Sequence, residues 1–327
     1  MALATTEKPE TFKEVIGKMG GAEKTTEVVF FFGAYSSQNI EKLRELTKGK
    51  VPNVIVVEGE KNPYFQKMIK GDITVDEYLR IWPYKFYNPE SGKRMLEFYK
   101  ELYEKGAKVE QLNSGLHIGG LIQRMEADKV RISSIVNGDF EKEVDATVKV
   151  AKIEADFFKV EKRMRAEEIA EKIKTGEWNG YILVEAGALH TRVKNILRGE
   201  LREMENVSIN SSYVHAEDAG KVFGRGVSEV YDPMNELIRM YVYEKEPAGK
   251  KLKEREKLLG ARSAIFCEVS KTSKARDMFE ATKLVNQLSY EECKKLFDKM
   301  HSNKMNEETA FRYVENFLKK KAELYSL

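Results

Sequence analysis

The chain has 327 residues, of which 42% are hydrophobic and 33% are charged, with 56 basic against 53 acidic side chains. This composition is that of a globular protein long enough for one large domain or two ordinary ones. A net charge of only +3 argues against a nucleic-acid-binding protein, which usually concentrates basic charge.

No stretch approaches the roughly 20 apolar residues that span a bilayer. The first residues, "MALATTEKPETFKEV", also lack an apolar signal core. We therefore expect a cytoplasmic protein that binds neither nucleic acid nor membrane.

Residue usage gives two further expectations. Cys267 and Cys293 lie in no CxxC or Cys/His spacing, so we expect inert thiols rather than a disulfide framework or a structural zinc site. Lys and Glu are abundant while Gln occurs only five times. This bias is typical of proteins from hot environments, where ion-pair networks cost less to desolvate, and it predicts a thermophilic source.

The first predicted elements form a strand–helix–strand unit. "TEVVFFFGAYSS" is an apolar run that stops at Gly33, the helical pattern "SQNIEKLRELTKG" follows, and "VPNVIVVEGEKN" is the next apolar run. Continuous apolar runs in such a unit predict parallel strands that are covered on both faces.

Residues 61–106 are predicted to be mostly helical, with breaks at Pro63, Gly71, Pro83 and Pro89. Aromatic side chains are dense in this segment, and they either cap a ligand pocket or pack the helices onto the sheet. They are Tyr64, Phe65, Tyr78, Trp82, Tyr84, Phe86 and Tyr87.

The rest of the chain predicts more strands and many helices. "AKVEQLNS" is a short strand, residues 139–174 are helical, and "YILVEAG" is a strand, followed by a helix over 189–204 and the strand "ENVSINSSYV". The last 80 residues are mostly helical, interrupted by "SAIFCEVS", which is short enough to be a strand. "GLHIGG" and "FGRG" lack the residues of a phosphate-binding loop and are interpreted as turns or places of close helix approach.

These elements predict an α/β fold in which helices flank a central parallel or mixed sheet built from two pseudo-repeated halves. Residues 1–245 would form the α/β core and residues 246–327 a mostly helical segment packed on it, as one compact unit. The charged run "EKEPAGKKLKEREK" is the best candidate boundary, although a solvated helix face explains the run better.

Two strand ends share one design. One strand runs into Gly33-Ala34-Tyr35-Ser36 and another into Gly187-Ala188-Leu189-His190, with the glycines 154 residues apart (187 − 33). Glycine at a strand end permits a sharp turn, and the residue three positions later falls in the first turn of the next helix. In a parallel sheet that position overlooks the carboxyl edge, where open α/β folds bind ligands. The helix dipole there favours a neutral imidazole, the form that binds metal or accepts a proton.

Two glutamates end apolar runs and raise a burial problem. Glu58 closes "NVIVVEG", and Glu185 lies two residues before Gly187. A buried carboxylate needs a cation, a metal ion or a proton, so each is either half of a structural ion pair or a functional group.

The segment "VEKRMRAEEIAEKIKTGEWNGYILVEAGALHTRVKNIL" resembles the superfamily that joins the erythromycin esterases, the haem-binding ChaN lipoproteins and the TraB and Tiki proteins. In that group an arginine on a helix precedes a strand with a GxxH signature, and Arg163 and His190 take these places. "VVFFFGAYSSQNIEKL" with "VPNVIVVEGE" resembles the first GxxH strand and the following strand that ends in glutamate, whose place Glu58 takes. One residue departs from the pattern, because Ser36 stands where the family has its first histidine.

The resemblance implies hydrolysis of an ester, lactone or amide bond, with or without a divalent metal such as manganese, cobalt or zinc. His190 would be a metal ligand or general base, Glu58 would activate water or bind the metal with Glu185, and Arg163 would orient a carboxylate or stabilise negative charge. Gly33, Ser36, Gly187 and His117 would contact substrate. His117 in "NSGLHIGG" and His215 in "SSYVHAED" are spare imidazoles that either replace the missing histidine or lie at the surface.

Two other classes of function remain open. The first is a non-catalytic protein of the same fold that binds haem or another small molecule, which the serine at position 36 favours. The second is a scaffold whose helical tail recruits partners. In the leading interpretation the ligand is a small molecule or a peptide, and the chain is a candidate homo-oligomer.

Overall fold

The computed structural model describes residues 25–33, 37–57, 61–81, 89–112, 118–187, 191–224, 230–243, 250–270 and 275–325. The chain divides into two compact units. The α/β unit comprises residues 1–115, 160–220 and 225–229, and the helical unit comprises residues 116–159, 221–224 and 230–327. This division differs from the expected boundary near residue 245, because residues 116–159 belong with the C-terminal helices.

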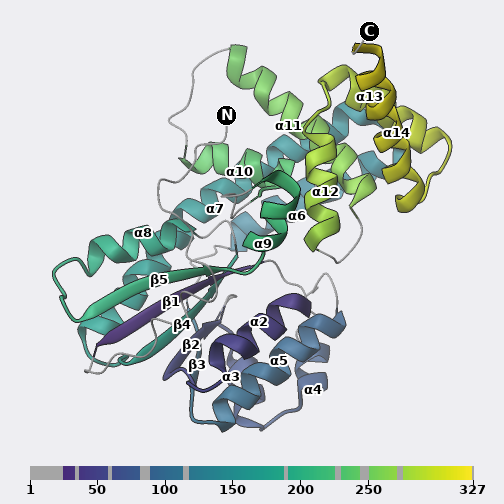
Figure 1. Ribbon diagram of the computed structural model, residues 1–327. Helices are drawn as coiled ribbons and strands as arrows, with labels where there is room; N and C mark the ends of the chain where they lie inside the picture. The colour runs from purple at the N-terminus through teal and green to yellow at the C-terminus, as the bar shows by residue number, and fades with distance from the viewer. Residues whose placement is uncertain are drawn as a thin grey trace. The chain divides into compact units, whose positions relative to one another are not determined.

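The α/β unit is built on five strands in the order β3-β2-β4-β1-β5, and every pairing among them is parallel. The predicted α/β fold with a central sheet is therefore confirmed, and the sheet is parallel rather than mixed (Figure 1). The strands are β1 Thr26–Phe32, β2 Val54–Val57, β3 Lys108–Gln111, β4 Tyr181–Ala186 and β5 Val207–Tyr213.

Helices cover both faces of this sheet, as the continuous apolar strands predict. One face packs against α2 to α5, and the other packs against the second half of α7 and against α8 (Figure 1). Alternate strand residues divide between the faces: Val29 and Phe31 point to the first, whereas Val28 and Phe30 point to the second. These helices are α2 Ser37–Thr47, α3 Pro63–Lys70, α4 Val75–Ile81, α5 Pro89–Glu104, α7 Phe140–Lys174 and α8 Thr191–Glu200.

The two predicted halves are visible in the topology. The unit β1-α2-β2 passes over β4, and the unit β4-α8-β5 passes over β1. As a result, β1 and β4 are neighbours inside the sheet. In the β1–β4 ladder Glu27 lies opposite Tyr181 and Phe32 opposite Ala186. This register keeps the same offset of 154 residues that separates Gly33 from Gly187.

The described aromatic side chains of residues 61–106 pack the helices onto the sheet, except for the exposed Tyr64 and Tyr103. Phe65 and Tyr78 are buried and meet edge to face with ring centroids 6.1 Å apart. Tyr64 is 40% exposed. Four further aromatics lie outside the described residues, namely Trp82, Tyr84, Phe86 and Tyr87.

The helical unit has its own apolar core, formed by buried residues such as Val144 of α7, Ile265 of α11 and Phe297 of α13. The expected strand "SAIFCEVS" is wrong, because its residues up to Val269 form the end of α11. A short apolar run cannot be distinguished from a buried helix by its pattern alone. The helices of this unit are α6 Ile118–Asn137, the first half of α7, α10 Pro233–Tyr243, α11 Lys250–Val269, α12 Ala275–Val285, α13 Tyr290–Ser302 and α14 Glu307–Tyr325. The short α9 Ala216–Phe223 begins in the α/β unit.

Three smaller expectations can also be compared with the structure. Of the two alternatives for "GLHIGG", a turn or a place of close helix approach, the turn is wrong at Gly119 and Gly120, which lie in the first turn of α6. Both cysteines are free thiols, as expected, and burial raises the pKa of Cys267 to about 11 and that of Cys293 to about 12. None of the described helices combines the length and the apolar character needed to cross a membrane.

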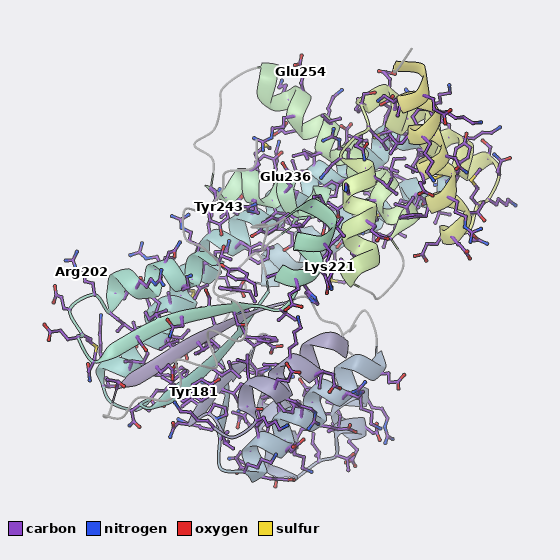
Figure 2. All side chains as sticks on the ribbon, viewed as in Figure 1. Tyr181, Arg202, Lys221, Glu236, Tyr243 and Glu254 are labelled. Atoms are coloured by element: carbon purple, nitrogen blue, oxygen red, sulfur yellow. The ribbon has the colours of Figure 1, made fainter. Side chains whose placement is uncertain are left out.

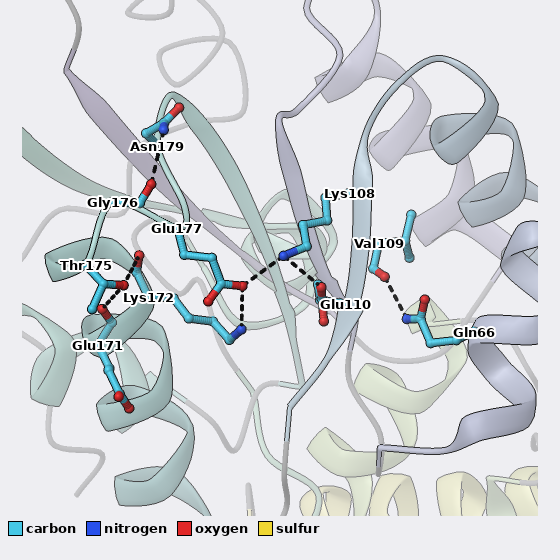
Figure 3. Close-up of polar contacts among 10 residues, drawn as sticks. All are labelled: Gln66, Lys108, Val109, Glu110, Glu171, Lys172, Thr175, Gly176, Glu177 and Asn179. Carbon is cyan, nitrogen blue, oxygen red and sulfur yellow. Dashed lines mark hydrogen bonds and ion pairs between the residues drawn. The ribbon is translucent and has the colours of Figure 1, made fainter.

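The amino edge of the sheet is held by polar contacts. Glu177 accepts hydrogen bonds from Lys108 and Lys172, each 2.8 Å long, and these lower the pKa of its carboxyl to about 2 (Figure 3). Asn53 forms two hydrogen bonds, each 2.8 Å long, with the backbone of Tyr181. The backbone N–H of Asn53 donates to the Tyr181 carbonyl, and the side-chain oxygen of Asn53 accepts from the Tyr181 N–H. Figure 2 labels Tyr181 at the start of β4. These contacts join the starts of β2, β3 and β4.

Gly180 is predicted to be a stability determinant of this edge. It has φ +72°, and a Cβ there would lie 2.4 Å from the side-chain oxygen of Asn53. Gly180→Ala should therefore carry left-handed strain of about 1–2 kcal/mol and also break the Asn53–Tyr181 hydrogen bond, which adds about 1–3 kcal/mol. Urea unfolding followed by circular dichroism measures the loss.

Gly176→Ala is the matched control, because Gly176 has φ +73° and no atom within 4 Å of the added carbon. It should carry the strain alone. Equal losses in the two variants would contradict the role assigned to the Asn53 contact.

Candidate functional site

The central strands β1 and β4 form a topological switch point. The chain leaves β1 through α2 toward β2, and it leaves β4 through α8 toward β5 on the opposite side. In open α/β sheets such a point opens a crevice outside the carboxyl ends of the strands, where ligands bind. Gly33 and Gly187 end these strands side by side, and the Gly33 N–H donates to the Ala186 carbonyl at 3.3 Å. The structure therefore brings the first glycines of the two predicted corners, Gly33 and Gly187, together.

Four of the candidate site residues lie outside the described residues, namely Ser36, Glu58, His117 and His190. Each follows the carboxyl end of a different described strand in the sequence: β1, β2, β3 and β4 respectively. Their roles therefore stay predictions.

Glu185 is buried in β4 at 5% exposure, on the sheet face that packs against α5. The hydroxyl of Tyr99, itself buried on α5, donates a hydrogen bond to one of its carboxylate oxygens. The described part of this carboxylate's environment thus includes a phenol. In the part of the chain that the structure describes, no group of three or more His, Cys, Asp or Glu side chains is placed to hold a metal ion.

Arg163 has a different environment from the one expected. Its side chain is 77% exposed on α7 and forms an ion pair with Glu167 at 2.7 Å. Two residues further on, Arg165 is only 6% exposed and forms an ion pair with Glu161 at 2.7 Å. The Nε of Arg165 has no hydrogen-bond partner among the described residues.

Arg165 lies on the half of α7 that covers the sheet, one residue before Ala166 of the apolar cluster on that face. Of Arg163 and Arg165, only Arg165 is buried.

His215 follows β5, which pairs with β1 at the edge of the switch point. It is 8% exposed, and the neighbouring Val214 N–H donates to the Phe32 carbonyl at 3.0 Å. The ammonium of Lys42, on α2, donates a hydrogen bond to the Val214 carbonyl. Burial first, and then the charge of Lys42, lowers the pKa of His215 to about 4, so this imidazole is neutral at pH 7.

The structure thus describes three separate polar groups around the sheet: a buried carboxylate and its phenol on the face that α5 covers, a buried arginine and its carboxylate on α7 over the opposite face, and a neutral imidazole after β5. Such a set can accept and donate protons and can bind negative charge. Tyr99, Lys42 and Arg165 were not selected from the sequence. The burial of Arg165 could have been anticipated from the helical spacing that places it four residues before the core residue Ile169, but the contacts of Tyr99 and Lys42 depend on the tertiary fold.

Comparisons with known proteins add one relative. The chain is 25% identical over 289 residues to an "Uncharacterized protein" of Archaeoglobus fulgidus, and the match covers 80% of this chain and 96% of the relative. No protein-family model and no solved structure matches the chain.

Removing the Tyr99 hydroxyl should destabilise the α/β unit. Tyr99→Phe leaves a buried carboxylate oxygen without this donor, which costs about 1–3 kcal/mol. Thermal or urea unfolding measures the change. Tyr64→Phe removes a hydroxyl from a tyrosine that is 40% exposed and should have little effect, whereas a Tyr99→Phe protein as stable as the native one would contradict the assigned contact.

His215 should make stability depend on pH. The unfolded chain binds a proton at this residue below about pH 6.5, but the folded protein does so only near pH 4. The free energy of unfolding should therefore fall as the pH falls from 6.5 to 4, by at most ~3 kcal/mol from this group. Denaturation of the native protein and of His215→Gln at several pH values measures this contribution.

The comparison of these two proteins isolates His215 from other titrating groups. Glu143 of the helical unit has a pKa raised to about 7, chiefly by burial, and acts in the opposite direction, but it is common to both proteins. Parallel stability curves between pH 7 and 4 would contradict the neutral, buried state of His215.

Proposed function

We propose that this protein is a hydrolase of an ester, lactone or amide bond, with its site at the carboxyl ends of β1 and β4. The observation that carries the proposal is the pairing of Gly33 and Gly187 at the switch point of a parallel sheet, where an α/β fold opens its ligand crevice. Polar groups buried near this edge support it, since burial of ionisable side chains is costly and marks functional sites more often than ordinary cores.

The proposed reaction needs a base, a binding site for negative charge and a closed environment. A water molecule loses a proton to the base and attacks the carbonyl carbon, the carbonyl oxygen takes up negative charge, and the leaving group departs with a proton. By resemblance the base is His190 or Glu58. Arg165, rather than the exposed Arg163, is the arginine that we assign to orienting a carboxylate or balancing negative charge.

A divalent metal such as manganese, cobalt or zinc is implied by the resemblance, with His190, Glu58 and Glu185 as its ligands. Of these three only Glu185 is described, and it accepts the hydrogen bond from Tyr99. The described residues alone do not make a metal site. The proposal therefore derives no step through a metal ion.

The second candidate is a non-catalytic protein that binds haem or another small molecule in the same crevice. Ser36, in the place of the family's first histidine, favours it, because a hydroxyl is a poor base and a poor ligand for soft divalent metals. Saturable haem binding with an absorbance band that shifts in His190→Ala, without hydrolysis of any ester, would favour this candidate.

The hydrolase proposal predicts a defined pattern among variants. On a panel of nitrophenyl esters, lactones and amides, Glu58→Gln and His190→Ala should lower kcat at least 100-fold, because each removes a group that acts on the reacting atoms. Arg163→Ala should keep kcat/KM within about threefold, since its guanidinium is exposed and paired with Glu167.

Arg165→Lys is the companion variant, because it keeps the charge but loses the planar fork that binds an anion with two hydrogen bonds. It should raise KM or lower kcat more than Arg163→Ala does. Full activity in both the Glu58→Gln and the His190→Ala protein would exclude this site.

A further inference from the structure

Glu143 is a buried carboxylate of the helical unit whose two oxygens are unequally satisfied. Its side chain, on α7, is 0% exposed. One oxygen, Oε1, accepts a hydrogen bond from the Thr147 hydroxyl at 3.2 Å, while the other, Oε2, is buried without a hydrogen-bond partner among the described residues. A buried carboxylate in this setting needs a cation or a proton, because an uncompensated charge in the interior is costly.

The cation that faces Glu143 is the guanidinium of Arg131 on α6, and it is shared. Its Nη1 lies 3.9 Å from Oε1 of Glu143, which is beyond hydrogen-bond distance, and 3.7 Å from the sulfur of Cys267 on α11. Its Nε donates to Asp128 at 3.3 Å. On the far side of this group, Asp232 acts on the Cys267 thiol. Arg131 therefore balances a charge on Glu143 only in part.

The helices around Glu143 are closely packed. Gly260 of α11 meets α7 at Val144, the residue after Glu143, where a Cβ on the glycine would lie 3.0 Å from a Val144 methyl carbon. On α6, Ala127 is 0% exposed and Ser134 is 4% exposed. Water can therefore reach the Glu143 carboxylate only if α6 or α11 moves away from α7.

The other charged groups that face Glu143 also disfavour its ionised form. Burial is the largest influence and raises the pKa of Glu143 to about 7. Arg131 opposes this rise, while Glu268 of α11 and Asp128 of α6 add to it through like charge. The groups that set the protonation of Glu143 thus come from both helices that pack against this part of α7.

We propose that Glu143 is a pH-dependent switch of the helical unit: with its proton, the side chain keeps α6 packed against α7 and α11, and without its proton α6 opens more readily. The neutral carboxyl needs no cation and fits the closely packed interior. The ionised carboxylate faces two acidic side chains and a shared guanidinium, and it is better solvated when α6 has moved away.

The direction of the switch follows from where the proton is held more tightly. The carboxyl has a pKa of about 7 when α6 is packed and an ordinary value of 4.5 when it is open to water. Between pH 4.5 and 7 the packed form therefore holds a proton that the open form has lost, and packing weakens as the pH rises through this range. The equilibrium for opening shifts by at most ~300-fold, which is 10 raised to the power 7 − 4.5.

Hydrogen–deuterium exchange of the native protein and of Glu143→Gln tests the switch, because glutamine cannot ionise. The readout is the ratio of the native exchange rate to the variant exchange rate for the backbone amides of α6. This ratio should rise by about tenfold or more between pH 5 and pH 8. Comparing the two proteins at the same pH cancels the pH dependence of chemical exchange.

Asp145→Asn is the matched control, because Asp145 is an exposed carboxylate two residues further along α7. Its ratio should stay constant within about threefold between the same pH values. A packing role of Glu143 alone would change the ratio equally at pH 5 and pH 8. A ratio for Glu143→Gln that does not change with pH therefore overturns the proposal, whatever the substitution does to overall stability.

Carbon-13 NMR of labelled glutamate carboxyl groups follows the proton itself. The carboxyl resonance that disappears in Glu143→Gln should titrate near pH 7 in the native protein. It should titrate at higher pH in Arg131→Met, because the guanidinium favours the ionised form. Circular dichroism of the variant establishes that it is folded. A midpoint below about pH 5 in the native protein would overturn the switch.

Discussion

The pairing of β1 with β4 is the constraint on which the α/β unit depends. These strands lie in the middle of the sheet, and their parallel register runs without a break from Glu27 opposite Tyr181 to Phe32 opposite Ala186. The connection from β1 through α2 to β2 and the connection from β4 through α8 to β5 run in opposite directions along the sheet. For this reason α2 covers one face of the sheet and α8 covers the other. The same register sets Gly33 beside Gly187. A slip of one residue would turn the apolar side chains of a strand to the wrong face and separate the two corners.

The two edges of the sheet have different chemistry. At the amino edge, Asn53 is paired with the backbone of Tyr181 and Glu177 with two lysines, while the Tyr181 hydroxyl is buried without a hydrogen-bond partner among the described residues. Near the carboxyl edge, ionisable side chains are buried, including Glu185 and His215. The first arrangement stabilises strand order, whereas the second is the more costly and is the one expected of a site that binds or transforms a ligand.

Much of the α/β unit could be predicted from its sequence, because apolar runs that end in glycine or a carboxylate define buried parallel strands. Three of the five strands, β1, β2 and β4, belong to runs that end in this way, and the runs predicted for β3 and β5 also coincide with strands of the sheet. The helical unit was harder. Ala264 and Ile265 belong to a helix buried in a helical core, where the apolar pattern has no clear period, and so the segment resembled a strand.

The candidate site was only partly accessible to sequence reasoning. Glycine corners and the burial of Glu185 follow from local patterns, but its partner Tyr99 lies 86 residues away and is set by how α5 packs. The exposure of Arg163 and the burial of Arg165 depend on which side of α7 meets the sheet. The neutral state of His215 depends first on its burial and then on the charge of Lys42, which lies on another helix, and both depend on the tertiary fold.

The most direct test of the central claim, that ligands bind at the carboxyl ends of β1 and β4, is a thermal-shift screen of the metal-stripped protein. Manganese, cobalt, zinc, iron, haem and a panel of esters and lactones would be compared in the native protein, His190→Ala and His301→Ala, because specific binding stabilises the folded state. We predict at least one compound that raises the melting temperature of the native and His301→Ala proteins but not that of His190→Ala. Compounds that stabilise all three proteins equally, with none sensitive to His190, would contradict the account.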